Sequence, residues 1–148
     1  LPGGARGDIV EMVQNIDYAP TFLELAGVAV PDDIQGVSLL PLLRGEHPAG
    51  WRRSLYYHFY EYPAEHMVKR HYGVRNDRWK LIHFYNDIDQ WELYDLQEDP
   101  HELRNLYGLP GYAAPRREMT DELVRLQTQY GDTLALRRNG RVTAANGN

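Results

Sequence analysis

The chain has 148 residues, a formal net charge of −5, no cysteine and 43% hydrophobic residues, which fits one globular domain or a piece of a larger one. The acid excess argues against a nucleic-acid-binding domain, and the lack of cysteine excludes a disulfide framework and a thiolate metal site. No apolar run approaches the roughly 18 residues of a membrane span, so neither nucleic acid nor a membrane is expected as a partner.

The N-terminal third predicts a strand followed by a helix. Residues 9–16 are mostly apolar and β-compatible, which predicts a short buried strand. Asp17 is then the expected helix N-cap, with Pro20 in the first turn and Gly27 as the stop. Residues 38–45, SLLPLLRG, predict one or two further helical turns that begin at a serine and end at a glycine.

The middle of the chain changes to a strand pattern. Four β-rich runs follow one another, separated by turn-forming residues: LYYHFYEY (55–62), VKRHYGVRN (68–76), WKLIHFYN (79–86) and WELYDL (91–96). Asn76 and Asp77 between two alternating runs predict a tight hairpin. Consecutive short strands predict an antiparallel sheet with one face covered by helix, so the fold class of this chain is α+β.

Two helices are predicted after the strands. Asp99 as N-cap, Pro100 as first residue and Glu102 three residues after the cap form a capping-box pattern, and Leu103 and Leu106 are expected to pack that helix onto the sheet. A longer helix is predicted over Pro115–Tyr130, where apolar residues at 4-3-4 spacing form one stripe. The stripe consists of Met119, Leu123, Leu126 and Tyr130.

Four motifs in this order resemble the C-terminal third of the sulfatase family, within the alkaline phosphatase superfamily. They are NIDYAPTFLELAGV (15–28), QGVSLLPLLRG (35–45), YGVR followed by WKLI (72–82), and ELYDL followed by DP, E and NL (92–106). Each motif alone is weak, but four in register over about a hundred residues are specific. The resemblance is closest to sulfatases of amino sugars and glycosaminoglycans.

The resemblance implies a division of the chain. Residues 1–50 are expected to be the end of an α/β catalytic domain, and residues 51–136 a C-terminal subdomain with an antiparallel sheet and a helix. Residues 137–148 are polar and rich in glycine and asparagine, which predicts a flexible tail. Because the chain begins with a loop at Leu1 rather than with Met, we expect it to start within a longer protein whose upstream catalytic domain is its partner.

The resemblance also implies cofactors that this chain does not hold. Sulfatases use a formylglycine, made from a Cys or Ser in a C/S-x-P-x-R motif, and a calcium ion held by Asp and Asn or Gln. The chain has no such motif, and its Asp32-Asp33 pair lies in a loop that lacks the strand context of a metal cluster. We therefore expect the isolated chain to be inactive, with no cofactor of its own. A periplasmic or secreted location follows only from the resemblance.

Histidines in the segment YHFYEYPAEHMVKRHY (57–72) are the candidate substrate-binding residues. In sulfatases of amino sugars a similar segment borders the active-site pocket, and a histidine there helps to bind the sugar. Imidazole suits this task because it can donate to a hydroxyl or, when protonated, pair with a sulfate. His66 is the first choice because it follows a Pro-Ala loop, and His58 and His71 are weaker candidates that could instead be packing residues.

Other interpretations remain open at this point. His58, Glu61, His66 and His71 have the residue types of a metal site, but no pair of them has the i, i+4 spacing of ligands on a clear helix. The function could also be that of a stand-alone carbohydrate-binding or scaffold domain, or of a related phosphodiesterase or phosphonate hydrolase. The sequence favours a sulfatase segment that hydrolyses a sulfated carbohydrate as part of the whole enzyme.

Overall fold

The computed structural model describes residues 7–138, and the side chains up to residue 136. Its internal contacts divide the chain into unit 1, Leu1–Arg53, and unit 2, Ser54–Asn148. In unit 1 the helical elements are η1 (Asn15–Asp17), α1 (Tyr18–Leu25) and α2 (Leu40–Leu43). No helix of the described residues is both long enough and apolar enough to cross a membrane.

Residues 9–16, all of which the structure describes, form no strand, so the prediction of a buried strand there is wrong. A strand needs a neighbour for its N–H and C=O groups, and the sheet found among the described residues is built within residues 55–95. The end of this stretch instead winds into η1. The backbone N–H of Gln14 donates to the Asp17 carboxylate at 2.7 Å, which tightens that turn.

Helices α1 and α2 lie where the sequence predicts them. Gly27 has φ +69° and Gly45 has φ +80°, left-handed conformations that end the two helices at low steric cost. The Ser38 hydroxyl accepts a hydrogen bond from Leu40 N–H at 3.2 Å. Asp17 does occupy the N-cap position of α1, but its side chain makes no capping hydrogen bond there. Its carboxylate has other partners, so the predicted role of that side chain is wrong.

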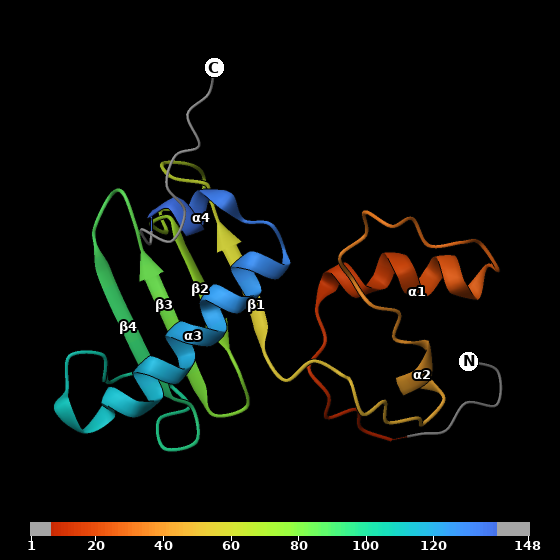
Figure 1. The fold of residues 1–148 in the computed structure, drawn as a ribbon, viewed down its shortest axis with the longest axis horizontal. Coiled ribbons are helices and arrows are strands. Elements are labelled where there is room, and N and C mark those ends of the chain that lie inside the picture. Colours follow the sequence, from red (N-terminus) through yellow and green to blue (C-terminus); the bar gives the residue numbers. More distant parts are fainter. Residues whose placement is uncertain (1–6, 139–148) are drawn as a thin grey trace. The chain divides into compact units, whose positions relative to one another are not determined.

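Unit 2 contains the predicted four-stranded antiparallel sheet, in the order β1-β2-β3-β4 (Figure 1). The strands are β1 (Leu55–Phe59), β2 (His71–Arg75), β3 (Trp79–Phe84) and β4 (Gln90–Asp95). The predicted hairpin joins β2 to β3. There the Asn76 side-chain oxygen accepts hydrogen bonds from the N–H groups of Arg78 at 2.9 Å and Trp79 at 2.6 Å. This asparagine therefore fixes the register of the central strand pair.

One face of the sheet is covered by α3 (Ala113–Gln129), which runs across the strands in Figure 1. Met119, Leu123 and Leu126 are buried, which confirms the predicted stripe. They pack with the sheet residues Tyr72, Val74, Leu81 and Leu93 in one core cluster. Burying one such side chain stabilises a fold by about 1.5–3 kcal/mol. The α+β class and the helix-covered sheet are therefore as predicted; η2 (Pro110–Tyr112) precedes α3 and α4 (Thr133–Arg138) follows it.

The predicted helix over residues 99–106 does not form in this described segment. Glu102 has φ +56°, a left-handed conformation that a helix cannot contain. The Asp99 carboxylate accepts instead from Arg104 N–H at 2.8 Å, and Leu106 N–H donates to the Leu93 carbonyl of β4 at 2.8 Å. Leu106 is buried as expected, but Leu103 is 85% exposed, so its predicted packing is wrong. The segment follows the sheet edge as a loop.

Helix α4 reaches Arg138 and thus includes the first two residues of the predicted tail. The remaining residues of that range, 139–148, lie outside the described residues.

Candidate functional site

The sheet register separates the two histidines that lie on strands. His58 of β1 pairs with Tyr72 of β2, and Phe59 pairs with His71. Directly opposed residues share a face and successive residues alternate. His58 therefore lies on the face that α3 covers, together with the core residue Tyr72, and His71 lies on the opposite face.

His58 is held inside unit 2 by polar contacts. Its Nδ1 lies 2.5 Å from a carboxylate oxygen of Asp132, and its Nε2 lies 2.6 Å from the Tyr85 hydroxyl. The Tyr56 hydroxyl donates to the same carboxylate at 2.6 Å. Burial alone would raise the pKa of Asp132, but hydrogen bonds from Tyr56, the Ala135 N–H and His58 outweigh it and lower that pKa. Since the His58 side chain is only 4% exposed, this geometry suits a structural role, in which His58 links β1 to the segment just after α3.

His71 is half-buried among aromatic rings. Its ring centroid lies 5.4 Å from that of Phe59 and 5.1 Å from that of Phe84. The ring Nδ1 is 2.8 Å from the Lys69 carbonyl, so this nitrogen carries a proton and donates. The other ring nitrogen, Nε2, is then the atom that could contact a ligand in the neutral form.

His66 lies between these two histidines in the sequence, on the connection between β1 and β2. It is exposed, as are its neighbours Glu65 and Met67. This position gives the imidazole access to a ligand without the removal of a packing contact. Of the three candidates, His66 is exposed, His71 is half-buried and the His58 side chain is buried, and His58 and His71 lie on opposite faces of the sheet.

Among the described residues, no group of three or more His, Cys, Asp or Glu side chains could hold a metal ion. The set His58, Glu61, His66 and His71 is accordingly not a metal centre in this structure.

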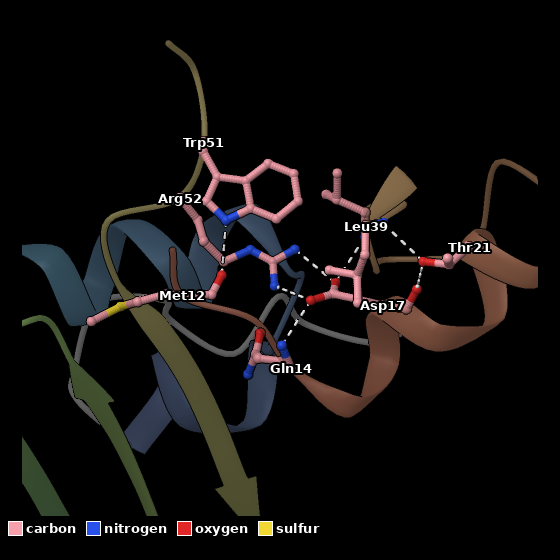
Figure 2. A network of polar contacts seen from close by, with 8 residues as sticks. Met12, Gln14, Asp17, Thr21, Leu39, Trp51 and Arg52 are labelled. Carbon is pink, nitrogen blue, oxygen red and sulfur yellow. Dashed lines mark hydrogen bonds and ion pairs between the residues drawn. The ribbon is translucent and has the colours of Figure 1, made fainter. Parts of the chain in front are cut away.

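A buried polar network in unit 1 was not foreseen from the sequence (Figure 2). Arg52 donates two hydrogen bonds to the Asp17 carboxylate, at 2.6 and 2.7 Å. The N–H groups of Val37, at 2.9 Å, and Gln14, at 2.7 Å, donate to the same carboxylate. Nearby, the Trp51 indole N–H donates to the Met12 carbonyl at 2.9 Å.

The Asp17 side chain is fully buried and Arg52 is 12% exposed, so the pair is shielded from solvent. Burial by itself would raise the pKa of Asp17, but the hydrogen bonds from Arg52, Val37 and Gln14 outweigh it and keep that pKa below its usual range. The carboxylate is thus charged and engaged by donors, which suits a structural role. Arg52 gave no sequence signal because a partner 35 positions away follows no helical or strand spacing.

Comparison with known proteins identifies the chain. A family model described as "N-sulphoglucosamine sulphohydrolase, C-terminal" matches residues 2–129. An N-acetylglucosamine-6-O-sulfatase of Bacteroides thetaiotaomicron is 53% identical over 134 residues, which cover 89% of this chain and 24% of that protein. The chain thus spans about a quarter of the length of such relatives.

Solved structures agree with this. One, described as a complex with its substrate D-glucosamine-2-N,6-O-disulfate, is 56% identical with a TM-score of 0.75, and the match covers 79% of this chain and 24% of that one. A phosphonate monoester hydrolase of Agrobacterium radiobacter is 30% identical with a TM-score of 0.70, over 82% of this chain and 26% of that one. The chain belongs to the N-sulphoglucosamine sulphohydrolase C-terminal family of sulfatases.

Proposed function

We propose that the chain is the C-terminal part of a sulfatase that hydrolyses sulfate esters on an amino sugar or a glycosaminoglycan-type glycan. The observation that carries this proposal is the 53% identity to an N-acetylglucosamine-6-O-sulfatase across 89% of the chain. The residues of the pocket determine which substrate an enzyme accepts. Because the similarity to this relative includes the loop that carries His66, a glucosamine 6-O-sulfate is the first substrate to test.

The expected domain division follows from the same proposal. Residues 1–50 would complete the catalytic α/β domain of the whole enzyme, and residues 51–136 would form its C-terminal subdomain. In support, unit 1 exposes large apolar side chains, with Val10 83%, Phe22 66% and Tyr18 56% exposed. Apolar surface of this kind is typical of a buried interface, and we assign it to the upstream part of the catalytic domain.

Within that enzyme the chain would supply one wall of the sugar pocket. His66 is the residue that we expect to contact the substrate, because its exposed imidazole can donate to a sugar hydroxyl or pair with a sulfate. His71 could assist through Nε2 from the face of the sheet that α3 does not cover. His58 stays a weaker substrate contact, since its two ring nitrogens already face Asp132 and Tyr85.

The reactive groups are expected upstream of this chain. The chain has no cysteine and no C/S-x-P-x-R motif, and the resemblance implies that the calcium ligands also precede this segment. A formylglycine nucleophile and a calcium ion that offsets the sulfate charge would therefore come from the upstream domain. The isolated chain is expected to release no sulfate.

A phosphonate monoester hydrolase is the second candidate, because such an enzyme shares this fold at 30% identity. The identity of the chain to sulfatases is clearly higher, at 53–56%, which favours the sulfate ester. A stand-alone carbohydrate-binding domain is less favoured, since the relatives carry this segment as about a quarter of a longer enzyme.

The test uses the full-length protein with glucosamine 6-O-sulfate and with a phosphonate monoester, and compares kcat/KM for the two. Sulfate release that greatly exceeds phosphonate cleavage supports the proposal, and the reverse preference overturns it. His66→Ala should raise KM about tenfold, because one hydrogen bond to a charged group is worth roughly 1.5 kcal/mol or more. His101→Ala, at an exposed histidine of the loop that follows β4, is the matched control and should leave KM unchanged.

A further inference from the structure

The connection between β1 and β2 is long and exposed. It covers residues 60–70, whereas a hairpin loop of about 2–5 residues would suffice to join two adjacent antiparallel strands. Its outer part includes Met67 at 70% and Val68 at 47% exposure, next to His66. A loop of this length adopts one position only if contacts within it offset the entropy of ordering.

Arg70 supplies such contacts at the point where the loop enters β2. Its Nε donates to the carbonyl of Tyr60 at 3.0 Å, and one terminal nitrogen donates to the carbonyl of Tyr62. The other terminal nitrogen lies 3.4 Å from a carboxylate oxygen of Asp87, in the connection between β3 and β4. One guanidinium thus joins three parts of the chain. They are the outgoing arm of the loop (residues 60–62), the returning arm (residues 69–70) and the neighbouring turn that contains Asp87.

Lys69 adds a second contact between the same two arms. Its ammonium lies 3.8 Å from the centroid of the Tyr62 ring and also donates to the Tyr62 hydroxyl. Both cations of the returning arm therefore bind the outgoing arm near Tyr62. Residues 63–68, with His66 among them, lie beyond this fastened base.

We propose that Arg70 is a positioning residue for the sugar-binding loop. It does not touch the substrate; it fixes the base of the loop and so determines where His66 stands. Asp87 orients the guanidinium from the next turn, at 3.4 Å. This inference rests on the proposed function, because it concerns the same substrate-binding residue.

The shape of the guanidinium explains why arginine is needed here. Its donors point in fixed directions in one plane and reach several acceptors at once, whereas a lysine ammonium is a compact charge on a flexible stem. Arg70→Lys should therefore keep the charge opposite Asp87 but lose the link between the carbonyls of Tyr60 and Tyr62. We expect it to behave much more like Arg70→Ala than like the wild type.

The first test is a double-mutant cycle in the full-length protein, with D-glucosamine-2-N,6-O-disulfate as the probe. Arg70→Ala should raise KM about tenfold while kcat changes less than about threefold, since the reacting groups lie elsewhere. If Arg70 acts through His66, the Arg70→Ala change should have little further effect on KM in a His66→Ala background. Arg75→Ala, at an exposed arginine of the other end of β2, is the matched control.

The second test does not depend on activity. Hydrogen exchange of the backbone amides of residues 61, 62 and 64–69 should be faster in Arg70→Ala and in Arg70→Lys than in the wild type, and unchanged in Arg75→Ala. Equal exchange in all four proteins would overturn the inference, as would KM effects of Arg70 and His66 that simply multiply. If the wild type is active but the KM effects of Arg70→Ala and His66→Ala multiply in the double variant, only this inference is overturned. A full-length wild type that releases no sulfate overturns the proposed function and this inference with it.

Discussion

Arg52 and Asp17 form a two-pronged ion pair inside unit 1, with nitrogen–oxygen distances of 2.6 and 2.7 Å. The pair joins the residue that precedes α1 to the end of the unit. Two backbone N–H groups, of Gln14 and Val37, complete the surroundings of the carboxylate. The pair therefore fastens three chain segments of unit 1 through one buried charge.

Removal of one partner of this pair should be strongly destabilising. Arg52→Ala leaves the buried Asp17 carboxylate without its counter-charge, which typically lowers the free energy of unfolding by about 3–5 kcal/mol. Native-state hydrogen exchange of the Val37 amide in the full-length protein measures this, because that N–H donates to the carboxylate. Arg44→Ala, at an exposed arginine of the same unit, is the control. Equal protection of Val37 in both variants would contradict the structural role of the pair.

The same carboxylate should make stability depend on pH. Asp17 has a lowered pKa in the folded chain, because hydrogen bonds from Arg52, Val37 and Gln14 outweigh the effect of burial. Its contribution is therefore full above its unfolded pKa of about 3.9 and is lost as the pH falls through the lower folded value. Denaturant titration between about pH 2 and 7 measures the free energy of unfolding. The wild type should lose its stability advantage over Asp17→Asn only in this acid range. A constant advantage down to the lowest pH would be the contrary result.

Gly36 should tolerate no side chain. A methyl group there would lie 2.0 Å from the Ile16 carbonyl oxygen and 3.1 Å from the Asp17 nitrogen, which are backbone atoms that cannot rotate away. Gly36→Ala should lower the free energy of unfolding by at least the roughly 1–3 kcal/mol of ordinary overpacking. Gly50→Ala is the matched control, since nothing lies within 4 Å of its added carbon. Thermal unfolding of both variants is the measurement. Similar melting temperatures would contradict the close approach of Gly36 to the backbone of Ile16 and Asp17.

Asn105 should matter more for its amide than for its size. Its side-chain oxygen accepts from the N–H of Leu93 at 3.1 Å and of Tyr107 at 3.0 Å, and its nitrogen donates to the Trp91 carbonyl at 2.9 Å. Asn105→Ala should destabilise unit 2 by about 3 kcal/mol, since it removes three hydrogen bonds that each contribute about 1 kcal/mol net. Asn105→Asp keeps the acceptor but brings a carboxylate toward the Trp91 carbonyl, so it should not rescue the loss.

Amide exchange of Leu93 and Tyr107 is the measurement for Asn105. Gln97→Ala, at an exposed residue of the turn after β4, serves as the reference variant. A wild-type exchange rate in Asn105→Asp would show that the donor to Trp91 is dispensable.

His58 and His66 should respond to substitution in opposite ways. His58→Ala should lower the melting temperature, because the imidazole is 4% exposed and lies between Asp132 and Tyr85. KM for the sugar sulfate should then stay near the wild-type value. His66→Ala should raise KM and leave the melting temperature unchanged, because its side chain is exposed. A paired measurement of both quantities in the full-length protein decides between the two roles for each residue.

The sequence alone determined the elements whose signal is local. β-rich runs between turn-forming residues predicted the four strands, and the 4-3-4 stripe predicted α3, because both signals lie within the element that they predict. Gly27 and Gly45 predicted two helix ends, since glycine adopts left-handed conformations without strain. The four motifs indicated the family, and the separate segment 57–72 indicated His66 as a residue to test.

The tertiary structure alone decided the features that depend on distant partners. Residues 9–16 carry a strand pattern but form no strand, because a strand exists only where a neighbour accepts its hydrogen bonds. Residues 99–106 carry a capping-box pattern but form no helix. Leu106 N–H donates to the Leu93 carbonyl at the edge of the sheet, and Glu102 has a left-handed backbone conformation. These contacts with the sheet outweigh a short helix, which is only marginally stable by itself. The faces of His58 and His71 follow from the pairing of β1 with β2, and the charge of Asp17 is held by an arginine 35 residues away. Contacts of such long range have no period in the sequence, which is why only the folded chain reveals them.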